Sequence, residues 1–290
     1  MLTPQVITGE GLVPYRNVLV PVEDHSRIAS VLATAALLGR TFESFIQGVP
    51  LAPDISDIVI ADISIGATVF DARAREVLSD RALKQFQAAM HMHDVPRFTP
   101  GSSSFSQEWL PSMMSDSALG PYARIFDLIV VGKPGSGHLD PRQATFESVL
   151  FESGRPLLIA PPKIPQKLGE TILIAWNRSS ETARTLHFAL PLLRRAKRIV
   201  IQTLEVYSVP GPSGDQLAQA LARDGIMAES YTITDKSPNE GPAILAKAAE
   251  IRADLVIKGG YTQSRLRQMI FGGATSHILA HSELPVFMAH

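Results

Sequence analysis

The 290-residue chain contains no cysteine, which excludes disulfide bonds, thiolate metal sites and a cysteine nucleophile. It also has almost no net charge, because 27 Lys and Arg residues stand against 28 Asp and Glu residues. A nucleic-acid binder normally shows a basic excess, so we expect no nucleic-acid partner. No run reaches the ~18 apolar residues of a membrane helix, and the start of the chain lacks the pattern of a signal peptide. These absences predict a cytoplasmic protein with no membrane partner.

Three segments of the sequence occur twice in the same order, in a chain long enough for about two domains. The pairs are 17–23 with 171–177, 127–132 with 254–259, and 155–160 with 284–289. Their offsets are 154, 127 and 129 residues, so the first copy carries 27 extra residues, which we place mainly within 53–69. The proline-rich segment 161–165 is typical of a linker. We therefore predict domains over 1–162 and 168–290.

Each copy alternates short strands with helices. The strand segments are continuous runs of Val, Ile and Leu, which is typical of a parallel sheet covered by helices on both faces. Apolar residues recur at helical spacing over 28–38 and 183–193, the second behind Ser179 and Ser180 as N-cap candidates. Further helices are predicted over 71–91, 216–223, 242–252 and 274–281. The pattern indicates an α/β fold, with one doubly wound, Rossmann-like parallel sheet in each half.

A glycine-rich segment, 259–275, follows an apolar strand and leads into the helix that starts near Gly273. In doubly wound folds, ligands bind beyond the carboxyl ends of the strands, near the point where the strand order reverses. Glycines let backbone N–H groups approach an anion, and a helix N-terminus adds unpaired N–H groups. Thr275 offers a hydroxyl group and Arg265 a positive charge to a phosphate. Such glycines also serve tight turns and close helix packing, and both interpretations stay open.

The ordered segments together resemble two universal stress protein domains in one polypeptide. The likeness rests on the opening strand with its terminal acid or amide, the Asp-Leu strand, the glycine loop and the closing Pro-Val-Phe-Met-Ala strand at 285–289. It implies an adenine-nucleotide alpha-hydrolase-like fold in each half, with the last strands of the two domains paired in an internal pseudo-dimer. In nucleotide-binding members of this family, three spaced glycines followed by Ser or Thr wrap the phosphates of ATP. The resemblance thus implies ATP or another adenine nucleotide, with Mg²⁺, in the second domain.

The second copy departs from the family pattern at three positions. Thr262 takes the place of the middle glycine, where a β-branched residue disfavours positive φ. Gly273 stands where a Ser or Thr is usual, which leaves Thr275 as the hydroxyl group. Asn177 replaces an Asp near the nucleoside, and its amide both donates and accepts hydrogen bonds. The candidate cofactor-binding residues are Asn177, Gly259, Gly260, Thr262, Arg265, Gly272, Gly273, Ala274 and Thr275.

The first copy departs from the pattern in a different way. Gly132 and Gly135 keep the spacing of the first two glycines, but Thr145 stands at the third position. Pro134 and Pro141 lie in the intervening loop and change its shape. We therefore expect no standard nucleotide site in this half, and a structural role for it.

The histidine pairs do not indicate a metal site, and the sequence lacks the common catalytic motifs. His277 and His281 share a helix face, as two zinc ligands do, but no third ligand is evident. His91 and His93 suit the C-terminal end of a helix. The sequence contains neither a Gly-x-Ser-x-Gly elbow nor a Walker loop. We predict no metal site and no catalytic residue.

The sequence thus predicts a non-catalytic universal stress family protein that acts in stress signalling or interaction and binds ATP or AMP in its second domain. The two domains are expected to pair with each other within the chain. A second copy of the chain, in a homodimer, and a protein of unknown identity are the other expected partners. Two alternatives stay open: a dimeric scaffold that needs no nucleotide, and a slow ATPase or phosphotransferase.

Overall fold

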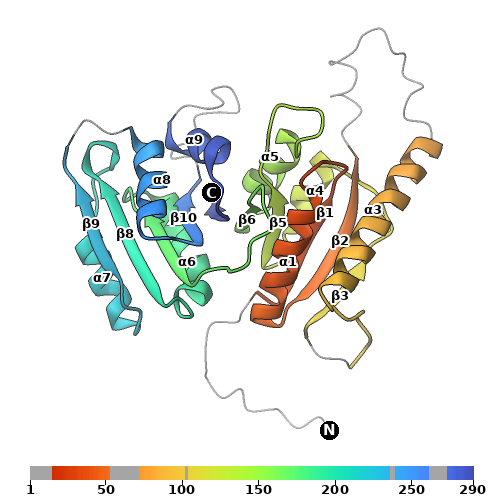
Figure 1. The fold of residues 1–290 in the computed structure, drawn as a ribbon, viewed down its shortest axis with the longest axis horizontal. Helices are drawn as coiled ribbons and strands as arrows, with labels where there is room; N and C mark the ends of the chain where they lie inside the picture. The colour runs from red at the N-terminus through yellow and green to blue at the C-terminus, as the bar shows by residue number, and fades with distance from the viewer. Residues whose placement is uncertain (1–14, 53–71, 102–103, 236–238, 261–272) are drawn as a thin grey trace.

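The computed structural model describes residues 15–52, 72–101, 104–235, 239–260 and 273–290, and the predicted insertion at 53–69 lies outside this part of the chain. Within the described residues, eleven strands form one sheet (Figure 1). The strands of the first half are β1 (Asn17–Val22), β2 (Phe45–Ala52), β3 (Ser106–Trp109), β4 (Met114–Ser115), β5 (Leu128–Gly132) and β6 (Leu157–Ala160). Those of the second half are β7 (Thr171–Ala175), β8 (Arg198–Leu204), β9 (Glu229–Ile233), β10 (Leu255–Gly259) and β11 (Val286–Ala289).

The strand order is β3-β2-β1-β5-β6-β11-β10-β7-β8-β9, with β4 beside β2. In the first half the chain runs outward from β1 to β2 and β3, then crosses to β5 and β6 on the other side, and β7 to β11 follow the same path. All neighbours within a half are parallel. The order therefore reverses between β1 and β5 and between β7 and β10, which are the switch points of a doubly wound fold. The fold class predicted from the sequence is confirmed.

The two halves meet at an antiparallel pair of strands in the middle of the sheet. Leu158 of β6 lies opposite Phe287 of β11, and Ile159 lies opposite Val286. All four side chains are buried. Tyr15 adds a link across this seam, because its hydroxyl group donates to the carbonyl of Phe188 at 2.7 Å. One apolar core therefore continues from the first half into the second.

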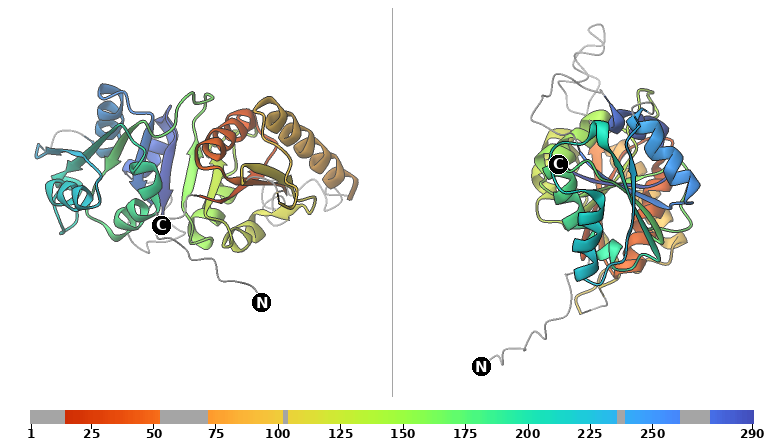
Figure 2. Two further views of the ribbon diagram at one scale, coloured as in Figure 1. Left: turned by 90° about the horizontal axis from the view of Figure 1, so that it is seen from below. Right: turned by 90° about the vertical axis from the view of Figure 1, so that its left-hand side faces the viewer.

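Helices cover both faces of the sheet (Figure 2). One face carries α1 (Ile28–Phe42), α3 (Ala72–Met92), α6 (Ser180–Leu193) and α7 (Gly214–Arg223). The other carries α4 (Asp116–Ala123), α5 (Gln143–Glu152), α8 (Glu240–Glu250) and α9 (Ala274–His281), and a short 3-10 helix, η1 (Glu205–Tyr207), follows β8. The predicted helices match α3, α7, α8 and α9 to within two residues, and Ser179 caps α6 as expected. None of the helices in the described ranges has the length and apolar character that crossing a lipid bilayer demands.

A lysine of the first half closes the C-terminal end of α9 in the second half. Lys133 follows β5, and its ammonium group donates to the carbonyls of Ala280 at 3.0 Å and Ser282 at 3.1 Å. The last carbonyls of a helix lack partners within the helix, and a cation offsets the dipole at that end. Burial lowers the pKa of Lys133, so these carbonyls replace much of the water that its charge has lost.

We predict that Lys133→Met destabilises the protein by about 1.5–3 kcal/mol, because two buried carbonyls lose a charged donor. The matched control is Lys163→Met, since Lys163 Nζ lies 3.8 Å from Glu283 Oε2 with both side chains exposed. That change should cost less than about 0.5 kcal/mol. Urea unfolding of both variants measures the difference, and equal losses would contradict a special role for Lys133.

Candidate functional site

The switch point of the second half lies where β7 and β10 end, and Asn177 follows β7 there. Its side-chain oxygen accepts a hydrogen bond from Thr182 Oγ1 at 2.6 Å and another from the backbone N–H of Ser179 at 3.2 Å. These bonds form an Asx turn that opens helix α6. The oxygen is therefore engaged locally, whereas the amide nitrogen has no hydrogen-bond partner among the described residues. Asn177 offers a ligand a donor.

Two predicted glycines at the end of β10 serve close packing. A methyl group at Gly259 would lie 2.6 Å from both the backbone nitrogen and Oγ1 of Thr182, so only glycine admits the start of α6 there. The N–H of Gly260 donates to the carbonyl of Ala289 at 2.7 Å. A methyl group at Gly260 would lie only 3.0 Å from that carbonyl oxygen. The packing interpretation of these two glycines is thus supported by direct contacts.

The start of α9 has the geometry of an anion-binding helix terminus. Gly273 precedes the helix with φ of +88°, a conformation that favours glycine. The first intrahelical bond runs from His277 N to the Gly273 carbonyl at 3.3 Å, so the N–H groups ahead of it have no partner inside the helix. Ala274 and Thr275 are both buried. Of these predicted residues, Gly273 and Ala274 line a cavity and Thr275 does not.

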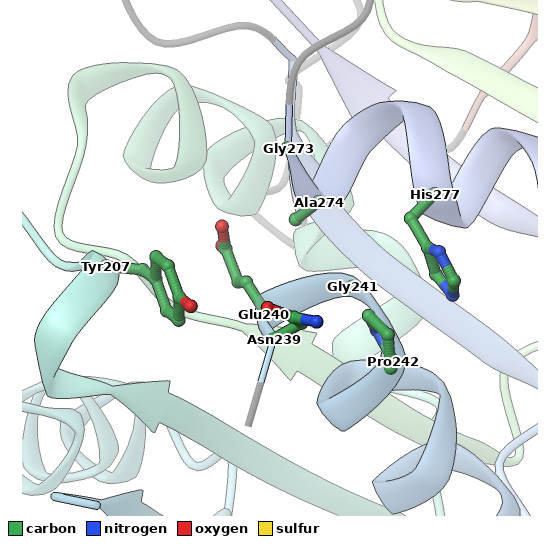
Figure 3. A pocket seen from close by; sticks show the side chains of 8 residues that line it. All are labelled: Tyr207, Asn239, Glu240, Gly241, Pro242, Gly273, Ala274 and His277. Carbon is green, nitrogen blue, oxygen red and sulfur yellow. The ribbon is translucent and has the colours of Figure 1, made fainter. Parts of the chain in front are cut away.

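This cavity, of about 300 Å³, lies between the N-termini of α8 and α9 and the 3-10 helix η1 (Figure 3). Its walls are Tyr207, Asn239, Glu240, Gly241, Pro242, Gly273, Ala274 and His277. The two helices approach closely, because a methyl group at Gly241 would lie 2.6 Å from His277 Cβ. The lining residues belong to segments that follow β8, β9 and β10 in the chain, and doubly wound folds bind ligands beyond the carboxyl ends of their strands.

Six of these eight residues were not predicted as binding residues from the sequence: Tyr207, Asn239, Glu240, Gly241, Pro242 and His277. The segment 239–242 combines Asn, Glu, Gly and Pro, a pattern that signals a helix start, and the structure places that start after β9. The position of this segment after a strand is the sequence signal that could have identified it as part of the site. The predicted residues Thr262, Arg265 and Gly272 lie outside the described residues.

The histidines on α9 stack on each other. The ring centroids of His277 and His281 are 4.2 Å apart, and His281 Nδ1 lies 3.0 Å from the His277 carbonyl. Across the described residues, His, Asp and Glu side chains form no cluster of three that would suit a metal ion. The pair therefore belongs to the helix surface and the pocket wall.

Side chains of the chain itself fill the corresponding switch point of the first half. Arg142 directly precedes α5, and its Nε and Nη2 each donate to Asp116 at 3.0 Å. Its Nη1 lies 3.2 Å from Glu23 Oε2, and its backbone N–H donates to the same oxygen at 3.1 Å. Thr145 Oγ1 completes the network with a 2.6 Å bond to Asp116. Glu23 and Asp116 are only 3 % and 2 % exposed, so Arg142 supplies the counter-charge for two buried carboxylates.

A proline and a histidine close the same space. A methyl group at Gly132 would lie 2.4 Å from Pro141 Cγ and 3.3 Å from His25 Nε2. Burial, followed by the charges of Arg142 and Arg27, lowers the pKa of His25 to about 4, so the ring is neutral at neutral pH. The end of β5 is thus covered by the loop that precedes α5.

Residues 169–290, which include β7 to β11, match the model of the Universal stress protein family. A universal stress protein from Archaeoglobus fulgidus DSM 4304 shares the fold with a TM-score of 0.70 and 16 % identity, over 96 % of this chain and 98 % of that one. A candidate universal stress protein from Pseudomonas aeruginosa UCBPP-PA14 aligns with a TM-score of 0.56 and 13 % identity, over 95 % and 93 % of the two chains. No protein with a curated function matches the sequence.

We predict that Arg142→Met costs about 3–5 kcal/mol of stability at neutral pH, because it leaves two buried carboxylates without a counter-charge. Burial already raises the pKa of Glu23, and loss of the guanidinium raises it further. As the pH falls, Glu23 is therefore protonated at a higher pH in the variant than in the unmodified protein. The loss of unfolding free energy caused by the substitution should shrink as the pH falls from about 7.5 to about 5.

The control is Arg81→Met, which removes a 2.7 Å ion pair with Asp24 whose side chains are 62 % and 34 % exposed. It should cost less than about 1 kcal/mol at either pH. Chemical unfolding of the three proteins at both pH values gives the comparison. If the stability lost in Arg142→Met were the same at both pH values, the loss could not be attributed to the buried carboxylates.

Proposed function

We propose that the second half binds an adenine nucleotide in the pocket at the start of α9 and acts by binding, without turnover. The observation that carries this proposal is the cavity of about 300 Å³, which lies beside the second switch point, against an α9 N-terminus that begins at a left-handed glycine. That volume is at the lower end of the range for small-molecule pockets. The resemblance to nucleotide-binding universal stress proteins supplies the class of ligand.

The walls of this pocket offer groups that suit the phosphate and the base of a nucleotide. The unpaired N–H groups at the start of α9 suit a phosphate, since a helix N-terminus favours an anion. Tyr207 offers an aromatic face to the base, and its side chain is 40 % exposed at the pocket rim. The free amide donor of Asn177 lies at the neighbouring end of β7. Together these groups support a site for a small phosphate ester.

We further propose that the chain is two copies of one domain, divided near 161–165, in which the first copy is a structural partner. The equivalent strand orders of the two halves and the antiparallel β6–β11 pair support this interpretation. The network of Arg142 supports the structural role, because side chains fill the first switch point. Stress signalling, through a protein partner or a second copy of the chain, is the biological role that we propose for this arrangement.

Thermal unfolding tests nucleotide binding directly. ATP, ADP and AMP, each with and without Mg²⁺, should raise the melting temperature, because a ligand specific for the folded state stabilises it by about 2.7 kcal/mol at a hundred times its Kd. The absence of a shift at millimolar concentration for every nucleotide would favour the nucleotide-independent scaffold. Release of phosphate from ATP over time, above a blank, would instead favour the slow ATPase.

We predict that Tyr207→Ala weakens nucleotide binding about three- to tenfold, through loss of about 0.5–1.5 kcal/mol of aromatic contact. Tyr231→Ala is the matched control, because Tyr231 is similarly exposed at 43 % but stacks beneath Lys247 on the edge strand β9. Isothermal titration with AMP compares the two. Equal affinities in both variants would place the base elsewhere.

A further inference from the structure

Arg178 follows Asn177 at the second switch point and has a left-handed backbone conformation. Its φ is +66°, in a region that residues with long side chains rarely occupy. Among the described residues, the other non-glycine residues with positive φ are Glu43, Asp94 and Arg252. Each of those three lies just after a helix, where this conformation commonly ends the helix, whereas Arg178 lies between a strand and a helix. Strain at such a place points to a side chain that the site uses.

The side chain of Arg178 reaches the 3-10 helix η1. Its Nη2 donates to Oε1 of Glu205, the first residue of η1. The two side chains are 15 % and 35 % exposed, so water screens this ion pair less than a fully exposed one. The N–H of Ser208 donates to the carbonyl of Glu205 at 3.2 Å and closes the turn that contains Tyr207. The ion pair therefore holds the turn from which Tyr207 projects.

Two hydrogen bonds fix the segment after η1 to the residues after β7. The N–H of Val209 donates to the carbonyl of Asn177 at 3.1 Å. The indole N–H of Trp176 donates to the carbonyl of Pro212 at 2.9 Å. Residues 205–212, which we call the η1 segment, are thus joined to the end of β7 at both ends, by the ion pair at one and by the indole at the other.

Tyr207 is the member of the η1 segment that lines the pocket. Figure 3 shows it at one side of the pocket, with His277 at the other. Within the described part of the chain, the side chain of Tyr207 has neither a hydrogen bond nor a ring contact. Its position therefore depends on the backbone of η1, and so on the contacts that hold η1 in place.

We propose that Arg178 is a positioning residue of this pocket: through its ion pair with Glu205 it holds η1 where the Tyr207 ring forms the wall for an aromatic base. This role rests on the nucleotide function proposed above and adds to it the residue that controls recognition of the base. Without the ion pair, the Tyr207 ring is less ordered before binding, so ordering it reduces the affinity for a base. A phosphate at the start of α9 meets other groups and is unaffected.

The test compares AMP with ribose 5-phosphate, which has the sugar and the phosphate but no base, by isothermal titration. Arg178→Met should weaken AMP binding about threefold and leave ribose 5-phosphate binding unchanged. Arg178→Gly removes the same ion pair and suits a φ of +66°, so it should give the same loss without added backbone strain. Arg178→Lys keeps a positive charge near Glu205 and should restore part of the AMP affinity.

A double-variant cycle shows whether Arg178 acts through Tyr207. In a protein that already carries Tyr207→Ala, Arg178→Met should have no further effect on AMP affinity. The matched control is Arg198→Met, because Arg198 makes a 2.8 Å ion pair with Glu229 and neither residue lines the pocket. That control should leave AMP affinity unchanged. Additive losses in the cycle, or equal losses for AMP and ribose 5-phosphate, would overturn the positioning role.

Failure of the nucleotide function itself gives a different result. If the unmodified protein binds neither AMP nor ribose 5-phosphate, the fluorescence of Trp176 tests Arg178 alone. Trp109→Phe leaves Trp176 as the sole tryptophan, and its indole is bonded to the η1 segment. A higher acrylamide quenching constant in Arg178→Met, reversed in Arg178→Lys, would retain the role of Arg178 in holding η1. Unchanged quenching would reject that role together with the nucleotide.

Discussion

The antiparallel pairing of β6 with β11 is the interaction on which the rest of the structure depends. Each strand is a four-residue apolar segment that is buried along its whole length. Without this pairing, each strand would be an apolar sheet edge with unpaired N–H and C=O groups, which favours aggregation. Pairing Leu158 with Phe287 removes both edges at once. The two halves are therefore held together by the same contacts that complete their cores.

This seam also fixes the position of the second switch point. The carbonyl of Ala289, at the end of β11, accepts hydrogen bonds from the N–H of Gly260 and the hydroxyl group of Thr185. Gly260 begins the glycine loop, and Thr185 belongs to the helix that opens at Asn177. Lys133 holds the far end of α9 from the first half. The first half thus shapes the pocket through the elements that surround it, although it contributes no residue to the lining.

The sequence predicted the fold well, because repeated apolar strands and helical periodicity are local signals that survive divergence. It predicted the site less well, because contacts between distant elements decide which residues face a ligand. Asn177 was expected to hold a nucleoside, but Thr182, five residues later, takes up its oxygen. A lysine within an apolar strand does not reveal that it will be covered, so the burial of Lys258 is evident only in the structure. Arg142 likewise gathers carboxylates from positions 23 and 116.

The two switch points show how one topology reaches two electrostatic outcomes. In the first half, the guanidinium of Arg142 makes two hydrogen bonds to Asp116 and an ion pair with Glu23, so it has little left to offer a ligand. In the second half, a cavity of about 300 Å³ lies between the N-termini of α8 and α9. Buried charges are costly unless they are paired, so the first arrangement favours a closed, rigid half. In a chain with a net charge of −1, the N–H groups at the start of α9 are a local feature that suits a phosphate.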